Sequence, residues 1–149
     1  MPVTDNTATE ETLWKENKLT PWLGPARMNW FKDNYLPNKD DWTKWDASPI
    51  FAPDELLKQT PAAWIAVAEM DILRDEGIAY GNKLKELGIP VETVVYKGAP
   101  HPIMAMDGYV FYSYRTVWSC ADMLSSRLKI GAQMVTDATT AMRKIWEET

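Results

Sequence analysis

The chain has 149 residues, of which 46% are hydrophobic and eight are tryptophan, a composition that argues against disorder and fits one domain with a hydrophobic core. The net charge of −5 and the lack of a basic cluster argue against nucleic acid and anionic membranes as partners. The single cysteine, Cys120, excludes an internal disulfide and gives no metal-binding pattern, so we expect neither a metal nor a cofactor.

The sequence also gives no sign of membrane insertion or export. No apolar run approaches the roughly 20 residues that a membrane-spanning helix needs. The residues that follow Met1 are polar and lack the apolar segment of a signal peptide. We therefore expect no membrane span and a cytoplasmic location.

The first 60 residues indicate short helices separated by loops. A short helix is predicted from Glu10 to Asn17, and Pro25 suits the first turn of a second helix, from Ala26 to Tyr35. Residues 38–53 have the composition of a loop, and residues 54–59 form one predicted helical turn after a proline. The larger apolar residues of the second helix share one face: Met28, Phe31 and Tyr35.

The middle of the chain predicts a strand, a helix and a second strand. Residues 63–69 form the first predicted strand, because residues 63–68 are a continuous apolar run, as in a parallel strand that is covered on both faces. Residues 74–87 have helical spacing, and residues 91–96 form the second strand. Because a helix connects the two strands, we expect them to pair in parallel.

Acidic residues follow the first predicted strand, and the only histidine follows the second. Asp71 and His101 would thus sit just beyond the carboxyl ends of neighbouring parallel strands, where distant residues can meet. A buried carboxylate beside an imidazole is the pairing that a serine hydrolase uses to hold its general base. The alternative is structural: His101 as a surface loop residue and Asp71 as a helix cap.

The motif AEMDILRDEG followed by GAPHP resembles the C-terminal half of an α/β-hydrolase of the hormone-sensitive-lipase-like (fold-3) carboxylesterase family. WFKDNYLP and DASPIFAP also match the family, and the resemblance covers most of residues 2–108. It implies that Asp71 and His101 are the acid and base of a Ser-Asp-His triad. It also implies that the loop of residues 38–53 contributes to an acyl or alcohol pocket.

The family's nucleophile elbow, Gly-x-Ser-x-Gly, and its oxyanion loop are missing from this sequence. We therefore expect a truncated, partial α/β-hydrolase fold, containing the last parallel strands, their flanking helices and cap-proximal material. Such a chain would need an N-terminal half to act on a small-molecule ester, and its sheet edge would favour self-association or binding to a homologous hydrolase. The alternative function is a non-catalytic remnant or interaction fragment.

We expect one α/β-hydrolase domain in four parts. Residues 1–53 are cap-proximal, residues 54–108 carry the strands with Asp71 and His101, and residues 128–149 form a C-terminal helix. Residues 109–127 have no counterpart that we recognise in the family. Their codons can contain a fungal-type intron donor, a branch point and a terminal AG, and their removal would keep the reading frame. We hypothesise that they are a translated, retained intron.

Other charged residues near the predicted pair allow more than one interpretation. Asp75 and Glu76 either favour the start of the helix through its dipole or belong to the site, and Asp75 can instead pin the loop together with Arg74. Glu69 lies two residues before Asp71 and can point the same way, which would make a paired-acid site.

Pro102 departs from the family's usual His-Gly-Phe and stiffens the loop without removing the base.

Overall fold

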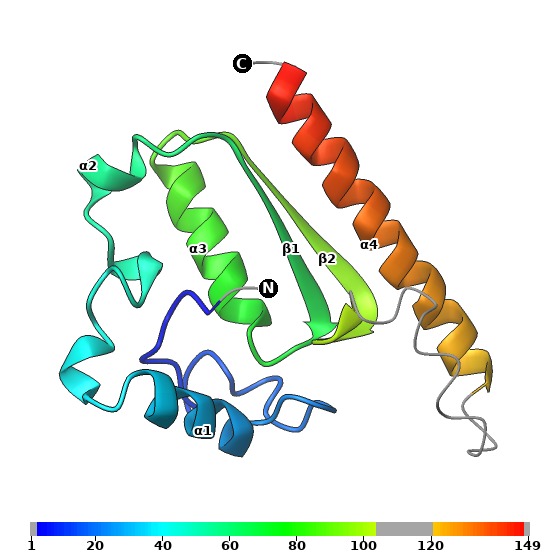
Figure 1. The fold of residues 1–149 in the computed structure, drawn as a ribbon, viewed down its shortest axis with the longest axis horizontal. Helices are drawn as coiled ribbons and strands as arrows, with labels where there is room; N and C mark the ends of the chain where they lie inside the picture. The colour runs from blue at the N-terminus through cyan, green and yellow to red at the C-terminus, as the bar shows by residue number, and fades with distance from the viewer. Residues whose placement is uncertain (1–2, 104–120, 148–149) are drawn as a thin grey trace.

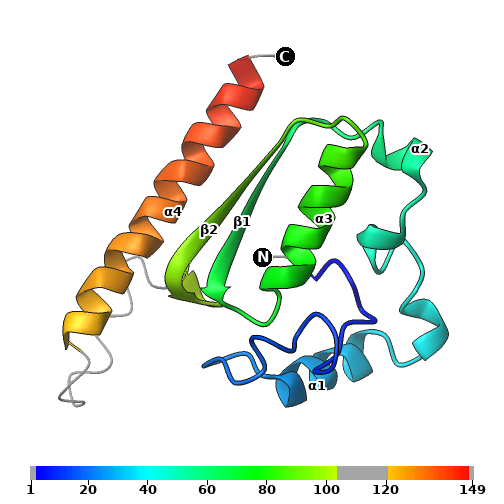
Figure 2. The same cartoon turned by 180° about the vertical axis from the view of Figure 1, so that it is seen from behind.

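The computed structural model describes residues 3–103 and 121–147. In this part of the chain, two parallel strands form a sheet with a helix against each face (Figure 1). Helix α3 (Arg74–Glu86) covers one face, and the long helix α4 (Ala121–Glu147) runs along the other, as the reverse view in Figure 2 also shows. The chain before residue 63 forms coil, turns and short helices, and it passes from the carboxyl ends of the strands to their amino ends, where the first strand begins (Figure 1).

The predicted strand–helix–strand unit is present. Strand β1 spans Ala63–Met70 and strand β2 spans Val91–Pro100, and the two pair in parallel. β2 continues past the predicted end at Tyr96. After an irregularity in the pairing, Pro100 of β2 pairs with Met70 of β1. Both strands therefore end next to the residues that the sequence analysis singled out.

Helix α3 lies very close to the sheet. A Cβ added to Gly77 would come within 2.9 Å of Val67 Cγ1, and one added to Gly81 within 2.9 Å of Thr93 Oγ1. The helix carries acidic residues in its first turn and basic residues in its last turn, which suits its dipole. Gly88 follows it with a φ of +84°, the left-handed conformation that glycine adopts at low cost.

Helix α4 begins at Ala121 rather than at the predicted Leu128. Its Met134 is buried against the sheet beside Ala68 and Tyr96, and the Tyr96 hydroxyl donates to Asp137 Oδ2 at 2.6 Å. Of the segment predicted to be a retained intron, residues 109–120 lie outside the described residues, and residues 121–127 belong to this helix. No helix in the described part of the chain is long and apolar enough to cross a membrane.

The remaining short helices precede the first strand, and one lies near the carboxyl ends of the strands whereas the other lies near their amino ends (Figure 1). Helix α1 spans Pro25–Tyr35, and the helical turn α2 spans Asp54–Leu57, close to both predictions. Between them lie two single 3-10 turns, η1 (Lys39–Asp41) and η2 (Pro49–Phe51). The loop predicted for residues 38–53 therefore contains two helical turns.

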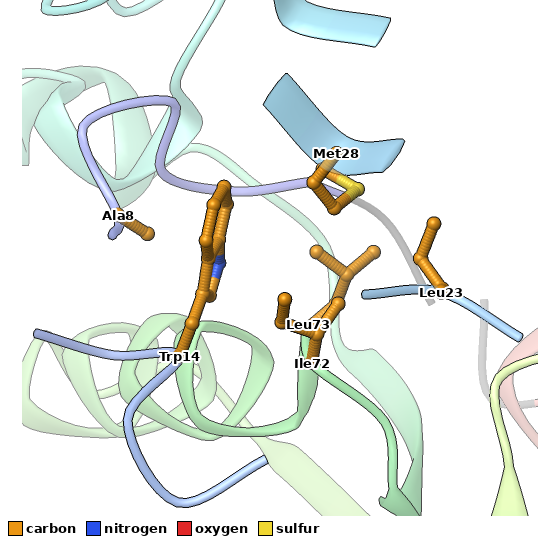
Figure 3. Close-up of a cluster of buried hydrophobic side chains, with 6 residues drawn as sticks. All are labelled: Ala8, Trp14, Leu23, Met28, Ile72 and Leu73. Carbon is orange, nitrogen blue, oxygen red and sulfur yellow. The ribbon is translucent and has the colours of Figure 1, made fainter. Parts of the chain in front are cut away.

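The helix predicted from Glu10 to Asn17 is wrong, because this segment forms consecutive turns instead. Most of its backbone bonds join residues three apart, as from Thr12 N to Thr9 O at 3.1 Å, and one joins Trp14 N to Thr9 O at 3.0 Å. The turns place Trp14 inside a cluster of buried side chains that joins this segment to α1 and to the chain after β1 (Figure 3). Burial of one large aromatic side chain fixes the segment more strongly than helix propensity does.

The face of α1 that is buried differs from the apolar face predicted from the sequence. Met28 and Lys32 are buried, whereas Phe31 and Tyr35 are exposed. The Lys32 ammonium lies 4.8 Å from the centre of the Trp14 ring and 4.1 Å from that of Trp42, and it donates to Ala8 O at 3.3 Å. Two aromatic faces and a carbonyl thus replace part of the water that the cation loses. Burial lowers the pKa of Lys32.

Glu76, in the first turn of α3, ties the start of the chain to the sheet. It is fully buried, and it accepts hydrogen bonds from Thr4 N at 2.8 Å and Trp14 Nε1 at 3.2 Å. The Thr4 hydroxyl donates to Glu76 O at 3.0 Å. Burial raises the pKa of the Glu76 carboxyl from 4.5 to about 7, against the lowering effect of these N–H donors. Glu76 is therefore a structural residue, and the helix-start interpretation describes only part of its role.

The shifted pKa of Glu76 predicts that the free energy of unfolding falls as pH rises from about 4.5 to about 7. In this range the folded chain holds the proton that the unfolded chain has lost, so stability present at low pH is lost as pH rises. The shift corresponds to about 3 kcal/mol. Glu76→Gln should remove this contribution, and urea unfolding at a series of pH values measures the difference from wild type.

The matched control is Glu86→Gln, which neutralises an exposed carboxylate at the other end of the same helix. It should leave the pH profile of wild type almost unchanged. A Glu76→Gln profile parallel to that of wild type would show that Glu76 does not titrate in this range.

Candidate active site

Asp71 follows β1 directly and is fully buried. Its Oδ1 accepts a hydrogen bond from Leu73 N at 3.0 Å, and its backbone carbonyl accepts one from Asn17 Nδ2 at 2.9 Å. These contacts fix both the carboxylate and the backbone. The helix-cap interpretation is wrong, because Leu73 is the N-cap residue of α3 and no side chain caps this helix. The contact of Oδ1 with Leu73 N closes a local turn before the helix and leaves Oδ2 for a further partner.

That partner is His101, the residue after the end of β2. Its Nδ1 lies 2.9 Å from Asp71 Oδ2, and about a third of its side chain is exposed. An ionised carboxylate only accepts hydrogen bonds, so Nδ1 carries the proton in this contact. In the neutral ring, Nε2 then has a free lone pair and can act as a base. The structure thus brings together the two residues predicted to form the site.

The paired-acid interpretation of Glu69 does not fit the structure. The Glu69 carboxylate accepts from Lys97 Nζ at 2.8 Å and from Gly98 N at 2.7 Å, and no contact joins it to Asp71. These two donors lower the pKa of Glu69. Glu69 therefore remains a carboxylate that holds β2, not a group that shares a proton.

Asp75 also has a structural partner. The Arg74 guanidinium binds it with two parallel bonds, Nε to Oδ1 at 2.7 Å and Nη2 to Oδ2 at 3.0 Å. The third contact of Arg74 joins Nη1 to Glu69 O at 3.1 Å. Asp75 thereby helps to hold the end of β1 and does not reach the Asp71–His101 pair.

Asn17 is a residue of the site that sequence reasoning missed. It is nearly buried, and it crosses 54 sequence positions to bind the carbonyl of Asp71. A single asparagine in a polar stretch carries no motif, so nothing in the sequence signals this contact. Among the described residues, no group of three metal-binding side chains is present.

A separate cavity of about 500 Å³ lies beside α1. Helix α1 contributes Met28, Phe31 and Tyr35 to its wall, the loop after η1 contributes Asp46, and η2 contributes Pro49. The wall is largely apolar at these residues, but neither Asp71 nor His101 belongs to it. The cavity is therefore distinct from the hydrogen-bonded pair.

Comparisons with known proteins bear on the family and the fold. A family model described as the α/β-hydrolase fold matches residues 1–105. An AB hydrolase superfamily protein of Schizosaccharomyces pombe is 44% identical over 109 residues, which cover 72% of this chain and 32% of the relative. Mouse hormone-sensitive lipase is 30% identical over 59 residues, or 40% of this chain and 8% of the lipase.

Among solved structures, a thermostable esterase from Pseudomonas putida matches with a TM-score of 0.62 and 40% identity. The match covers 67% of this chain and 31% of the esterase. The chain thus spans less than a third of the length of each of these three proteins. The predicted family resemblance and the partial α/β-hydrolase fold are confirmed.

The contacts of Asp71 predict that Asp71→Asn inverts the tautomer of His101. Leu73 N–H requires an oxygen at the Oδ1 position, so the new amide NH₂ faces Nδ1, which must then accept. The neutral imidazole would carry its proton on Nε2. His101 is the only histidine, so its two nitrogen-15 signals at about pH 9, where an imidazole is ordinarily neutral, identify the tautomer without ambiguity.

Asp75→Asn is the control, because it removes a nearby carboxylate that Arg74 binds instead of the imidazole. We expect it to keep the proton on Nδ1. A proton that stays on Nδ1 in Asp71→Asn would contradict the arrangement described here.

Proposed function

This chain belongs to the α/β-hydrolase fold-3 esterase family, and we propose that it supplies the acid–base pair of a carboxylic-ester hydrolase. The observation that carries the proposal is the 2.9 Å contact between His101 Nδ1 and the fully buried Asp71 Oδ2. His101 is the general base, and Asp71 fixes its tautomer and stabilises the imidazolium that forms.

The proposed reaction is acyl transfer to water in two halves. A serine Oγ attacks the ester carbonyl carbon while its proton passes to His101 Nε2, and the same proton then goes to the departing alcohol as the C–O bond breaks. Water repeats the sequence on the acyl-serine and releases the acid. Asp71 remains ionised throughout.

We infer that the serine and the oxyanion donors come from a polypeptide segment outside these 149 residues. The sequence lacks Gly-x-Ser-x-Gly. The one serine whose side chain the structure describes, Ser48, is buried and donates to Trp42 O at 2.6 Å. The chain alone is accordingly inactive, and its substrate is a small ester that binds only when the site is complete.

A second candidate is an interaction fragment that binds a full-length relative or a second copy of the chain. Three aromatic side chains on α1 favour it, because they are between 45% and 77% exposed: Trp30, Phe31 and Tyr35. Exposed apolar groups that gather on one element often mark a contact surface. This candidate requires binding but no hydrolysis.

A chimera tests the catalytic proposal. The 109 matching residues of the Schizosaccharomyces pombe relative are replaced by the aligned residues of this chain, and hydrolysis of a short-chain p-nitrophenyl ester is measured. We expect the chimera to be active. In the chimera, His101→Ala should lower kcat by roughly 10³-fold or more, because the serine then lacks its base.

The matched control is Lys97→Met, which changes an exposed side chain four positions from His101 and should leave kcat within about twofold of the unmodified chimera. An active chimera that is indifferent to His101→Ala would refute the assigned role. A folded but inactive chimera, together with binding of the chain to the intact relative in sedimentation, would favour the interaction fragment.

A further inference from the structure

The pairing of the two strands changes just before the site. Ala63 faces Val91 and Ala68 faces Tyr96, so each residue is paired with one 28 positions later (91 − 63). Met70, however, faces Pro100, which is 30 positions later (100 − 70). Between these pairs β1 contains one residue, whereas β2 contains three. Two extra residues of β2 are thus accommodated as a bulge.

The bulge sets the alignment of the candidate catalytic pair. With the offset of 28, Asp71 would stand opposite Ala99, and His101 would lie beyond it along the strand. With the offset of 30, Asp71 stands level with His101, which matches their sequence separation of 30. Gly98 makes the bulge possible, because its φ of +66° is unfavourable for other residues.

The side chain of Glu69 fills the gap that the bulge leaves in the ladder of backbone bonds. Its Oε2 accepts from Gly98 N at 2.7 Å, and its Oε1 accepts from Lys97 Nζ at 2.8 Å. Its backbone carbonyl accepts from Arg74 Nη1 at 3.1 Å. The bond to a backbone N–H is charge-assisted and stronger than a neutral one. The contact with Lys97, whose side chain is 80% exposed, contributes little.

We propose that Glu69 is a positioning residue, which holds the two-residue bulge of β2 and thereby places His101 at the level of Asp71. Glu69 contacts neither member of the pair, so it acts through Gly98 and the path of the chain from Gly98 to His101. The alignment follows from the strands alone. Its importance for ester hydrolysis rests on the proposed function.

The test follows the His101 Nδ1 proton in the 149-residue chain by NMR, without substrate. A bond to a buried carboxylate protects this proton from exchange with water. Glu69→Ala leaves Gly98 N–H without its acceptor and frees the bulge, so exchange should become about tenfold faster or more. Glu69→Gln keeps an oxygen for Gly98 N–H, and most of the protection should return.

Two controls separate positioning from general destabilisation. Lys97→Met removes only the exposed partner of Glu69 and should change exchange of the Nδ1 proton by less than about twofold. The backbone amides of Val94 and Val95, in the regular part of β2, should exchange within about twofold of wild type in every variant.

Protection of the Nδ1 proton that is unchanged in Glu69→Ala would overturn the proposal. So would a rise in Val94 and Val95 exchange by the same factor, because Glu69 would then only stabilise the sheet. Since the readout needs no serine, an inactive chimera would leave this result intact. An active chimera would not rescue the proposal if Glu69→Ala had no effect on the proton.

Discussion

The parallel pairing of β1 with β2 is the constraint on which the rest of the structure depends. Parallel strands cannot be joined by a tight turn, so a crossover helix has to carry the chain back to the end of the sheet where the first strand began. Helix α3 does this while lying so close to the strands that Gly77 and Gly81 have no room for a Cβ without displacing Val67 and Thr93. The same pairing brings the carboxyl ends of both strands to the same end of the sheet, where Asp71 and His101 meet.

Residues 3–62, the described part of the chain before β1, contain no strand, and buried polar groups hold this segment instead. Thr4 and Trp14 bind Glu76, and Asn17 binds the carbonyl of Asp71. A buried polar group without a partner costs free energy, so each contact is costly to break once its partners are buried. The N-terminal segment is therefore held by residues at the start of α3 and just after β1. The same contacts hold the backbone of Asp71 in the site.

The sequence predicted most of what depends on local patterns. Short apolar runs predicted β1 and β2, the connecting helix predicted their parallel pairing, and family motifs predicted Asp71 and His101. The errors lie where distant contacts decide. Residues 10–17 form turns because Trp14 is buried, and α1 buries Lys32 between two tryptophan rings instead of its aromatic residues. The contacts of Asn17 and Glu69 depend on geometry that no single-sequence pattern encodes.

The orientation of His101 is determined entirely within this chain. Leu73 N–H fixes one oxygen of Asp71, which leaves the other for the imidazole, while the bulge at Gly98 brings the imidazole level with it. Every donor and acceptor in these contacts belongs to this chain, which spans less than a third of the length of the relatives. In the proposed function, a serine from another segment would therefore meet an imidazole whose tautomer and direction are already set. Such preorganisation is what general-base catalysis requires, since no free energy is then spent on ordering the base during the reaction.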